Sequence, residues 1–251
     1  MAPLPPVFLE RPIAHRALHD RAKGRPENSR AAVRAAVAAG YGIEIDLQLS
    51  SDGEAMVFHD YELSRLTGEE GALRRRSAAD LGRIALRNGD EGIPTLAEIL
   101  AEVAGRVPLL IEFKDQDGAM GRNVGTLEAA AVAALSGYAG PVALMSFNPH
   151  SVAALAARAP HLPRGLTTCG YAAEDWPTLP PAIRDRLRGI PDFERTGAGF
   201  ISHNRRDLDN PRVTALRAAG VPVLCWTVRS PDQEAAARRV AQNITFEGYA
   251  A

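Results

Sequence analysis

The sequence predicts an α/β fold, a (β/α)8 barrel, on three observations. Short β-rich runs alternate with Ala-rich helical runs along all 251 residues, which is the pattern of parallel strands joined by crossover helices. The length is close to that of one such barrel. An open doubly wound sheet is the alternative, but His15-Arg16-Ala17-Leu18, which follows the first strand, is not the glycine-rich phosphate loop of that fold.

Nine runs have strand character. They are residues 12–17, 42–48, 55–59, 108–114, 142–147, 165–168, 199–203, 222–228 and 243–247. Run 55–59 follows run 42–48 through the turn Ser51-Asp52-Gly53, so we interpret it as a hairpin-like extension of the second strand. This interpretation leaves eight strands for the barrel.

Seven helical runs lie between these strands. They are residues 29–39, 95–104, 124–135, 149–158, 175–187, 210–219 and 231–241. Residues typical of helix N-termini precede or open several of them, and glycines stand where two of them end. The N-terminal signals are Asn28, Pro94-Thr95, Asn148-Pro149 and Ser230-Pro231, and the glycines are Gly40 and Gly220.

Two regions interrupt the alternation. Residues 61–93 are charged and glycine-rich, with one short helical pattern at 77–86, and they predict an insertion near the catalytic rim of a single domain spanning residues 1–251. After the last strand only Gly248-Tyr249-Ala250-Ala251 remain, so the last helix should be missing or truncated. The wall would then be open, or covered by the N-terminal segment or by a neighbouring subunit, which leaves homo-oligomerisation open.

The composition is that of an ordinary globular protein. Hydrophobic residues make up 46% and charged residues 24%, and the net charge of -1 with no basic stripe argues against a nucleic-acid partner. The Ala-rich runs 31–39 and 129–135 are too short or too interrupted for membrane insertion. The first six residues lack the features of a secretory signal, and Cys169 and Cys225 are expected to be buried thiols, so we predict a cytoplasmic protein.

Ionisable side chains stand at or near the ends of several strand runs. The C-terminal ends of barrel strands converge on one mouth, so residues far apart in sequence should meet there. The candidates are His15, Arg16, Glu44, Asp46, His59, Asp60, Glu112, Lys114 and the aromatic Trp226.

Three of these candidates are carboxylates that predict a metal site. Glu44 and Asp46 are two residues apart and so point to the same side of a strand, and Glu112 and Lys114 repeat this spacing. Carboxylates aimed into one narrow mouth repel unless a cation lies among them, and an all-oxygen ligand set favours Mg²⁺ or Ca²⁺. The alternative is an ion network in which Lys114 and Arg16 pair with the carboxylates.

Two histidines are suited to proton transfer. His15 and His59 each follow an apolar run and precede a charged residue, and the ordinary pKa of histidine lies near neutrality. Arg16 and Lys114 can neutralise a phosphate, arginine through its planar fork and lysine as a point charge.

Taken in order and spacing, these residues resemble the glycerophosphodiester phosphodiesterases over nearly the whole chain. The shared motifs are His15-Arg16, Pro26-Glu27-Asn28-Ser29, Glu44-x-Asp46, Ser51-Asp52-Gly53, His59-Asp60, Ile93-Pro94-Thr95-Leu96, Glu112-x-Lys114, Ser146-Phe147 and Trp226-Thr227-Val228. The resemblance implies a (β/α)8 barrel with a small insertion after the His-Asp pair. It further implies a divalent metal on Glu44, Asp46 and Glu112, often with help from Glu27. It assigns acid and base roles to His15 and His59, and phosphate binding to Arg16 and Lys114.

The reaction implied by the resemblance is metal-dependent hydrolysis of a small glycerophosphodiester to an alcohol and glycerol 3-phosphate. In that family the 2-hydroxyl of the substrate's glycerol is regarded as the nucleophile, giving a cyclic phosphate that water opens. Trp226 would pack against the glycerol or the departing alcohol. Two other readings remain: a phospholipase-D-like enzyme acting on lysophospholipids, which needs an apolar platform at the mouth, and a barrel that binds phosphate esters without turnover.

Three departures from the family pattern bear on substrate choice more than on reaction type. Ala17 replaces the usual glycine after His-Arg, and a ten-residue stretch, 17–26, precedes the Glu-Asn pair. The last strand ends in Phe246-Glu247-Gly248 where familiar members carry a Thr-Asp-x-Pro type sequence. Glu247 is therefore a candidate for the acid at that position.

Overall fold

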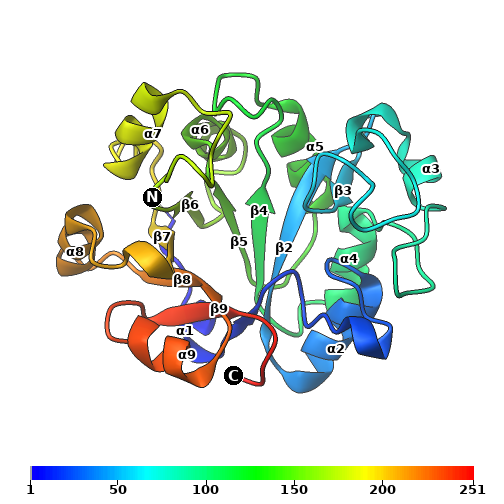
Figure 1. The fold of residues 1–251 in the computed structure, drawn as a ribbon, viewed down its shortest axis with the longest axis horizontal. Coiled ribbons are helices and arrows are strands. Elements are labelled where there is room, and N and C mark those ends of the chain that lie inside the picture. Colours follow the sequence, from blue (N-terminus) through cyan, green and yellow to red (C-terminus); the bar gives the residue numbers. More distant parts are fainter. Residues whose placement is uncertain (1) are drawn as a thin grey trace.

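The eight main strands close into a parallel barrel in the computed structural model, which describes residues 2–251. β1 pairs with β2 on one side and with β9 on the other, so the sheet has no open edge between the first and the last strand. The predicted (β/α)8 barrel is confirmed (Figure 1). Its strands are β1 (Ile13–Ala14), β2 (Gly42–Leu49), β4 (Leu109–Phe113), β5 (Val142–Ser146), β6 (Arg164–Thr168), β7 (Phe200–Asn204), β8 (Val223–Val228) and β9 (Asn243–Phe246).

The remaining strand, β3 (Ala55–Val57), runs antiparallel to β2 and pairs with its C-terminal half, with Leu47 opposite Val57. The interpretation of this run as an extension of the second strand is therefore confirmed. The extension carries the chain from the end of β2 back to the mouth, where His59 follows.

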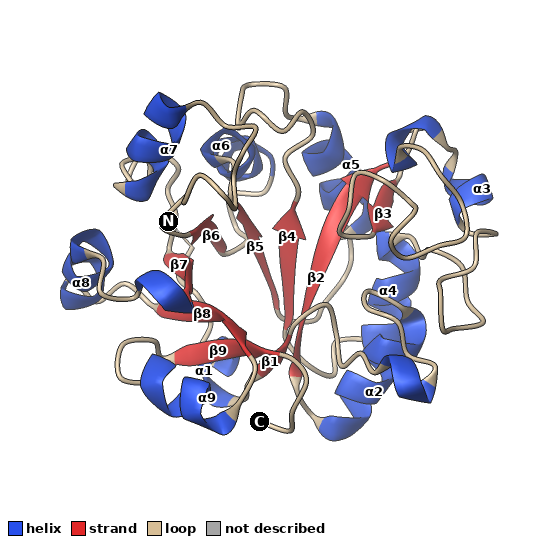
Figure 2. Cartoon of the chain, viewed as in Figure 1, coloured by secondary structure: helices blue, strands red, loops and turns tan. Residues whose placement is uncertain are grey.

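Helices surround the barrel, as the colouring by secondary structure shows (Figure 2). Their inward faces pack mainly on the outward side chains of the strands, and their exposed positions carry alanines as well as charged residues. They are α2 (Arg30–Ala39), α4 (Leu96–Val103), α5 (Thr126–Ala134), α6 (Pro149–Arg158), α7 (Pro181–Arg188), α8 (Pro211–Ala218) and α9 (Pro231–Ala237).

Apart from α7, the predicted helices begin within two residues of their predicted starts. α7 begins at Pro181 and not at residue 175, because Pro177 and Pro180 disfavour helical backbone in the residues before them. α2 is capped by Ser29, whose Oγ accepts a hydrogen bond from the backbone N of Ala32, 3.1 Å away. Asn28 has a left-handed backbone, φ 58°, and its side chain is used elsewhere.

A short N-terminal helix, α1 (Val7–Glu10), was not predicted, because four residues are too few for a periodic pattern. Phe8 is completely buried and packs with apolar side chains from the starts of the strands, among them Leu110, Phe200 and Leu224. Nδ2 of Asn243 donates to the backbone oxygen of Phe8, 2.7 Å away. The N-terminal segment thus plugs the end of the barrel opposite the mouth.

The outer wall beside β9 is covered by the chain's own last residues. Phe246 packs edge to face against Tyr41 and Tyr249, with ring centroids 4.8 and 5.5 Å away. The hydroxyl of Tyr41 donates to the backbone oxygen of Ala251, 2.7 Å away. Within the described residues no helix follows β9, and the sequence analysis did not foresee that four residues would cover this strand.

Residues 61–93 lie to one side of the barrel, next to β3 (Figure 1). They contain one 3-10 turn (Leu73–Arg75) and the single-turn helix α3 (Ala78–Leu81), shorter than the helical pattern at 77–86. Their apolar side chains form a small cluster of their own with Met56 and Phe58. Because this cluster anchors the segment beside β3, its first residues stand at the mouth.

Cys169 and Cys225 are both buried free thiols, as predicted. Among residues 2–251, every helix is too short or too polar to span a lipid bilayer.

We expect Phe8→Ala to lower the free energy of unfolding by about 3–5 kcal/mol, because it leaves a cavity where the ring plugs the barrel. Val7→Ala, at a half-buried position of the same turn, is the matched control and should cost about 1 kcal/mol or less. Urea denaturation followed by circular dichroism measures both variants. Equal costs for the two would contradict the role of Phe8 as the plug.

Candidate active site

A cavity of about 1010 Å³ opens at the C-terminal ends of the barrel strands. Nine of the predicted site residues line it, so the structure brings together side chains from five different strand ends. They are His15, Arg16, Glu44, Asp46, His59, Asp60, Glu112, Lys114 and Trp226. The three additional candidates, Glu27, Asn28 and Glu247, stand behind this lining and contact members of it.

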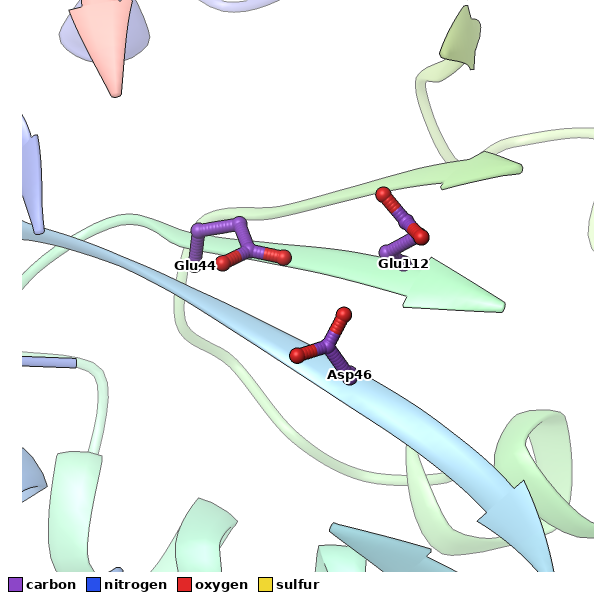
Figure 3. Close-up of side chains that lie close together, drawn as sticks. All are labelled: Glu44, Asp46 and Glu112. Atoms are coloured by element: carbon purple, nitrogen blue, oxygen red, sulfur yellow. The ribbon is translucent and has the colours of Figure 1, made fainter. Parts of the chain in front are cut away.

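The three carboxylates meet at the centre of the site. Asp46 on β2 lies opposite Glu112 on β4 in the strand register. Glu44 lies two residues before Asp46 and therefore on the same face of β2. One oxygen of each lies within 4.8 Å of the others, and all three side chains are buried (Figure 3). Such a compact set of buried carboxylate oxygens fits a hard divalent cation.

The charges of this group are only partly balanced by the protein. Nζ of Lys114 lies 2.7 Å from Oδ1 of Asp46 and also contacts Glu112, while Nε of Arg16 lies 3.5 Å from Oδ2 of Asp46. Burial and the neighbouring carboxylates raise the pKa of Glu44 well above its usual range. Burial opposes ionisation of Asp46 too, but Lys114, His59 and Arg16 together outweigh it and lower the pKa of Asp46. The ion network in which Lys114 and Arg16 pair with the carboxylates is thus present. It includes Asp46 and Glu112 and does not balance a negative charge on Glu44.

His59 is held by its neighbour in sequence. Its Nδ1 lies 2.6 Å from Oδ1 of Asp60, and because a carboxylate only accepts, Nδ1–H is the donor. This bond leaves Nε2 as the free ring nitrogen. Burial, with Lys114 second, lowers the pKa of His59 to about 4, which favours the neutral imidazole.

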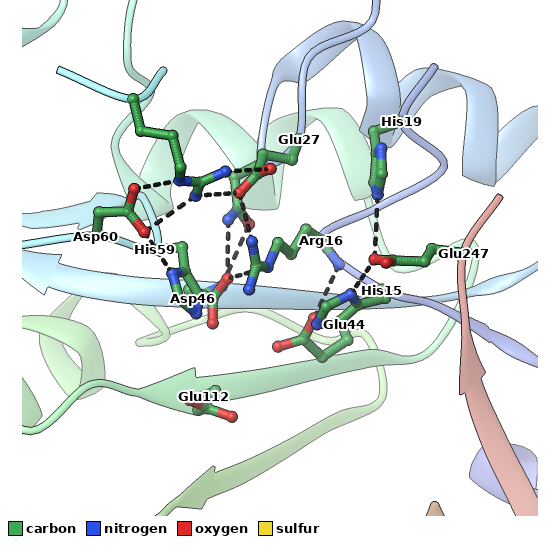
Figure 4. Close-up of polar contacts among 12 residues, drawn as sticks. His15, Arg16, His19, Glu27, Glu44, Asp46, His59, Asp60, Glu112 and Glu247 are labelled. Atoms are coloured by element: carbon green, nitrogen blue, oxygen red, sulfur yellow. Dashed lines mark hydrogen bonds and ion pairs between the residues drawn. The ribbon is translucent and has the colours of Figure 1, made fainter. Parts of the chain in front are cut away.

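His15 is held in the same manner by Glu247, at the end of β9. Nδ1 of His15 lies 2.5 Å from Oε2 of Glu247, and Glu247 also pairs with Arg229 at 2.7 Å. Burial lowers the pKa of His15, while the hydrogen bond to Glu247 opposes the shift. Both histidines therefore carry a carboxylate on Nδ1, from opposite sides of the site (Figure 4).

Asn28 and Glu27 support the lining from the loop after β1. Nδ2 of Asn28 donates to Oδ2 of Asp46 at 2.9 Å, and the backbone N of Asp46 donates back to Oδ1 of Asn28 at 3.2 Å. Oε1 of Glu27 accepts from Nη1 of Arg16 at 2.7 Å and from Arg65 at 2.8 Å. Burial would raise the pKa of Glu27, but Arg65 and Arg16 lower it to about 2.

Glu27 lies outside the group of carboxylate oxygens at the centre of the site. Its oxygens are occupied by the two guanidinium groups.

An apolar wall lies in the same cavity. Phe147, after β5, packs against Trp226 of β8 with ring centroids 5.5 Å apart and against Trp176 at 5.0 Å. Tyr171 lies 5.3 Å from Trp176, and Met120 packs on the same cluster. The indole Nε1 of Trp226 donates to the backbone oxygen of Ser202 at 2.9 Å, which fixes the ring. None of these apolar residues belongs to the insertion at residues 61–93.

Sequence reasoning missed several lining residues, among them Tyr171, Trp176 and Arg65. Trp176 lies in the loop that the sequence analysis assigned to a helix, and the nearby prolines were the available signal. Arg65 lies in the insertion, whose path is set by tertiary packing and has no periodic pattern.

Comparison with known proteins gives consistent matches. The model of the glycerophosphoryl diester phosphodiesterase family matches residues 15–243. A glycerophosphodiester phosphodiesterase of Caldanaerobacter subterraneus subsp. tengcongensis is 32% identical over 174 residues, 65% of this chain and 69% of that protein.

Solved structures match over a larger share of the chain. The structure of an Oleispira antarctica phosphodiesterase in complex with the product sn-glycerol-3-phosphate is 26% identical, with a TM-score of 0.77 over 96% of this chain and 93% of that one. A glycerophosphodiester phosphodiesterase structure from Parabacteroides distasonis, 21% identical, shows the same fold with a TM-score of 0.74 over 93% and 91% of the two chains.

The family match begins at His15 and extends to β9, so it includes both histidines and all three buried carboxylates. The barrel fold shared with the Oleispira structure and the similarity to the Caldanaerobacter enzyme agree with this family match. The chain therefore belongs to the glycerophosphoryl diester phosphodiesterase family and is an enzyme, a phosphoric diester hydrolase.

Proposed function

We propose that this enzyme uses a divalent cation and two histidines to hydrolyse glycerophosphodiesters to an alcohol and glycerol 3-phosphate. One observation carries the proposal: three buried carboxylates and two carboxylate-held imidazoles face the same cavity. The related Oleispira enzyme was solved with sn-glycerol-3-phosphate, the product expected here. Residues 1–251 would act as one domain, with residues 61–93 shaping one side of the mouth.

Glu44, Asp46 and Glu112 are the proposed ligands of the cation. Their oxygens lie close enough together to share one ion, and the raised pKa of Glu44 reflects a negative charge that the protein does not balance. An oxygen-only set suits Mg²⁺ or Ca²⁺. When bound, the cation would offset the charge that develops on the phosphoryl oxygens.

His15 and His59 are the proposed acid and base. Because Glu247 and Asp60 accept from their Nδ1–H groups, each ring keeps Nε2 for proton exchange with the substrate. Their lowered pKa values favour a neutral imidazole that can act as a base. The negative charge of a bound phosphodiester favours protonation of an adjacent imidazole, which supplies the acid.

Arg16 and Lys114 are the proposed phosphate ligands. Both side chains line the cavity beside the carboxylates, and both are mostly buried, so their charges are weakly screened. Glu27 is better placed to orient Arg16 than to bind the cation, because its two oxygens already accept from guanidinium groups. Asn28 would fix the position of Asp46.

The apolar wall favours one second candidate, activity on lysophospholipids. Phe147 packs edge to face against Trp226 and in a tilted arrangement against Trp176, and the three rings form an apolar surface in the cavity beside the catalytic centre. The surface is suited to an acyl chain or to the carbon skeleton of glycerol.

Purified enzyme incubated with Mg²⁺ or Ca²⁺ should release the alcohol and glycerol 3-phosphate from glycerophosphocholine and glycerophosphoethanolamine, and EDTA should abolish this release. Coupled assays for choline, ethanolamine and glycerol 3-phosphate measure it. Choline release from lysophosphatidylcholine alone would establish the second candidate. No turnover of any of the three substrates would refute the proposed function, and undiminished rates in EDTA would refute its metal dependence.

His59→Ala should lower kcat by roughly 10² to 10⁴ fold, the range for the loss of a general acid or base. Metal affinity should be retained, since His59 is outside the carboxylate group. His161→Ala, at an exposed position on the surface, is the control and should match the wild type. Wild-type kcat in His59→Ala would remove this residue from the mechanism.

Glu44→Gln and Glu112→Gln should each weaken Mg²⁺ or Ca²⁺ binding by at least roughly 100-fold, because each removes a charged ligand while keeping the shape of the side chain. Isothermal titration calorimetry measures the affinities. Glu174→Gln, which removes an exposed carboxylate at the rim of the same cavity, should bind metal as the wild type does. Unchanged titrations in both buried variants would overturn the ligand assignment.

A further inference from the structure

Arg65 connects the insertion to two loops of the active site. It follows β3 by a few residues, and its guanidinium lies between the carboxylates of Asp60 and Glu27. Nη1 donates to Oε2 of Glu27 at 2.9 Å, and Nη2 donates to Oε1 of Glu27 at 2.8 Å and to Oδ1 of Asp60 at 3.0 Å. Nε donates to the second oxygen of Asp60. One side chain thus makes two forked pairs, the strongest geometry available to arginine.

Each carboxylate held by Arg65 holds a lining residue in turn. Asp60 accepts from Nδ1–H of His59 at 2.6 Å, and Glu27 accepts from Nη1 of Arg16 at 2.7 Å (Figure 4). Arg65 is therefore one contact removed from His59 and one contact removed from Arg16.

Arg65 lines the cavity, but all three of its guanidinium nitrogens donate to these carboxylates. A direct role in phosphate binding is not supported by this arrangement. Its side chain is 40% exposed, whereas those of Glu27 and Asp60 are 7% and 21% exposed. Arg65 covers the two carboxylates from the solvent side and separates their like charges.

We propose that Arg65 is a positioning residue for hydrolysis: through Asp60 it directs Nε2 of His59 into the cavity, and through Glu27 it orients Arg16. The inference rests on the function proposed above. It makes the insertion part of the catalytic apparatus, since the side chain that ties the two loops together comes from residues 61–93.

The two links have separable consequences. Loss of the Asp60 link lets the imidazole of His59 rotate, which lowers the rate of the chemical step and hence kcat. Loss of the Glu27 link loosens Arg16, which weakens substrate binding and raises KM. A residue that served only to pin the insertion would change neither constant.

The test compares Arg65→Ala with Arg83→Ala, whose side chain is 77% exposed in the same insertion and pairs only locally, with Asp80. On glycerophosphocholine, Arg65→Ala should lower kcat roughly tenfold and raise KM by a few fold, since small misplacements of catalytic groups reduce turnover by such factors. Arg83→Ala should match the wild type. Arg65→Lys should recover part of the loss, because a lysine can pair with one carboxylate but cannot span two.

A double-variant cycle identifies the route. In a His59→Ala background, Arg65→Ala should leave kcat unchanged, because the group that it positions is gone, and should still raise KM through Arg16. An undiminished kcat effect in that background would overturn the link to His59. Metal titration should be unaffected by Arg65→Ala, because Arg65 contacts none of the central carboxylates.

Wild-type kcat and KM in Arg65→Ala would overturn the proposal. If this variant does not fold, as judged by circular dichroism, Arg65→Gln decides on the same criteria, because it keeps a polar side chain as far as the position of Nε and loses both forks. Failure of the proposed function has a different signature, since the wild type itself would then release no glycerol 3-phosphate.

Discussion

The active site depends on placing three carboxylates in one buried space. Glu44, Asp46 and Glu112 cannot all stay charged there without cations, because burial and mutual repulsion both disfavour ionisation. Lys114 and Arg16 supply two positive charges, which do not balance three negative ones, and the proposed divalent ion would supply the rest. The same shortage of positive charge is consistent with the position of Lys114 and Arg16, the proposed phosphate ligands, directly beside the proposed metal ligands.

Side chains behind the cavity lining fix the orientation of the residues that line it. Asp60 and Glu247 each hold one imidazole, so both rings present Nε2 to the cavity, and Asn28 holds Asp46 by two hydrogen bonds. This duplicated arrangement separates a hydrolase from a barrel that only binds phosphate esters. Binding needs positive charge, whereas the proposed proton transfer needs oriented imidazoles, and the carboxylates on Nδ1 orient the two rings and oppose the lowering of their pKa by burial.

The centre of the site could be predicted from the sequence because barrel geometry is repetitive. Residues at strand ends converge whatever their separation, so His15, Glu44 and Glu112 could be placed together without coordinates. Contacts that arise from irregular chain paths could not be predicted from the sequence. Arg65 reaches the site through an insertion without periodicity, and Phe8 plugs the barrel from a four-residue helix that no pattern reveals. The cover of β9 by Tyr249 likewise follows from packing of a short tail.

The mouth divides along the chain into a charged half and an apolar half. The central ionisable groups stand at the strand ends from β1 to β4, while the loops after β5 and β6 and the end of β8 carry Phe147, Trp176 and Trp226, with charged residues such as Arg205 and Asp207 at the rim. The groups proposed for the chemistry and the surface proposed for the alcohol therefore lie on different segments. Because a substitution in the apolar half touches no carboxylate or imidazole of the centre, the range of alcohols accepted can diverge within the family while the reaction is retained. The departures of this sequence from the family pattern at Ala17 and Glu247 fall instead beside His15, where they act on the geometry of the charged half.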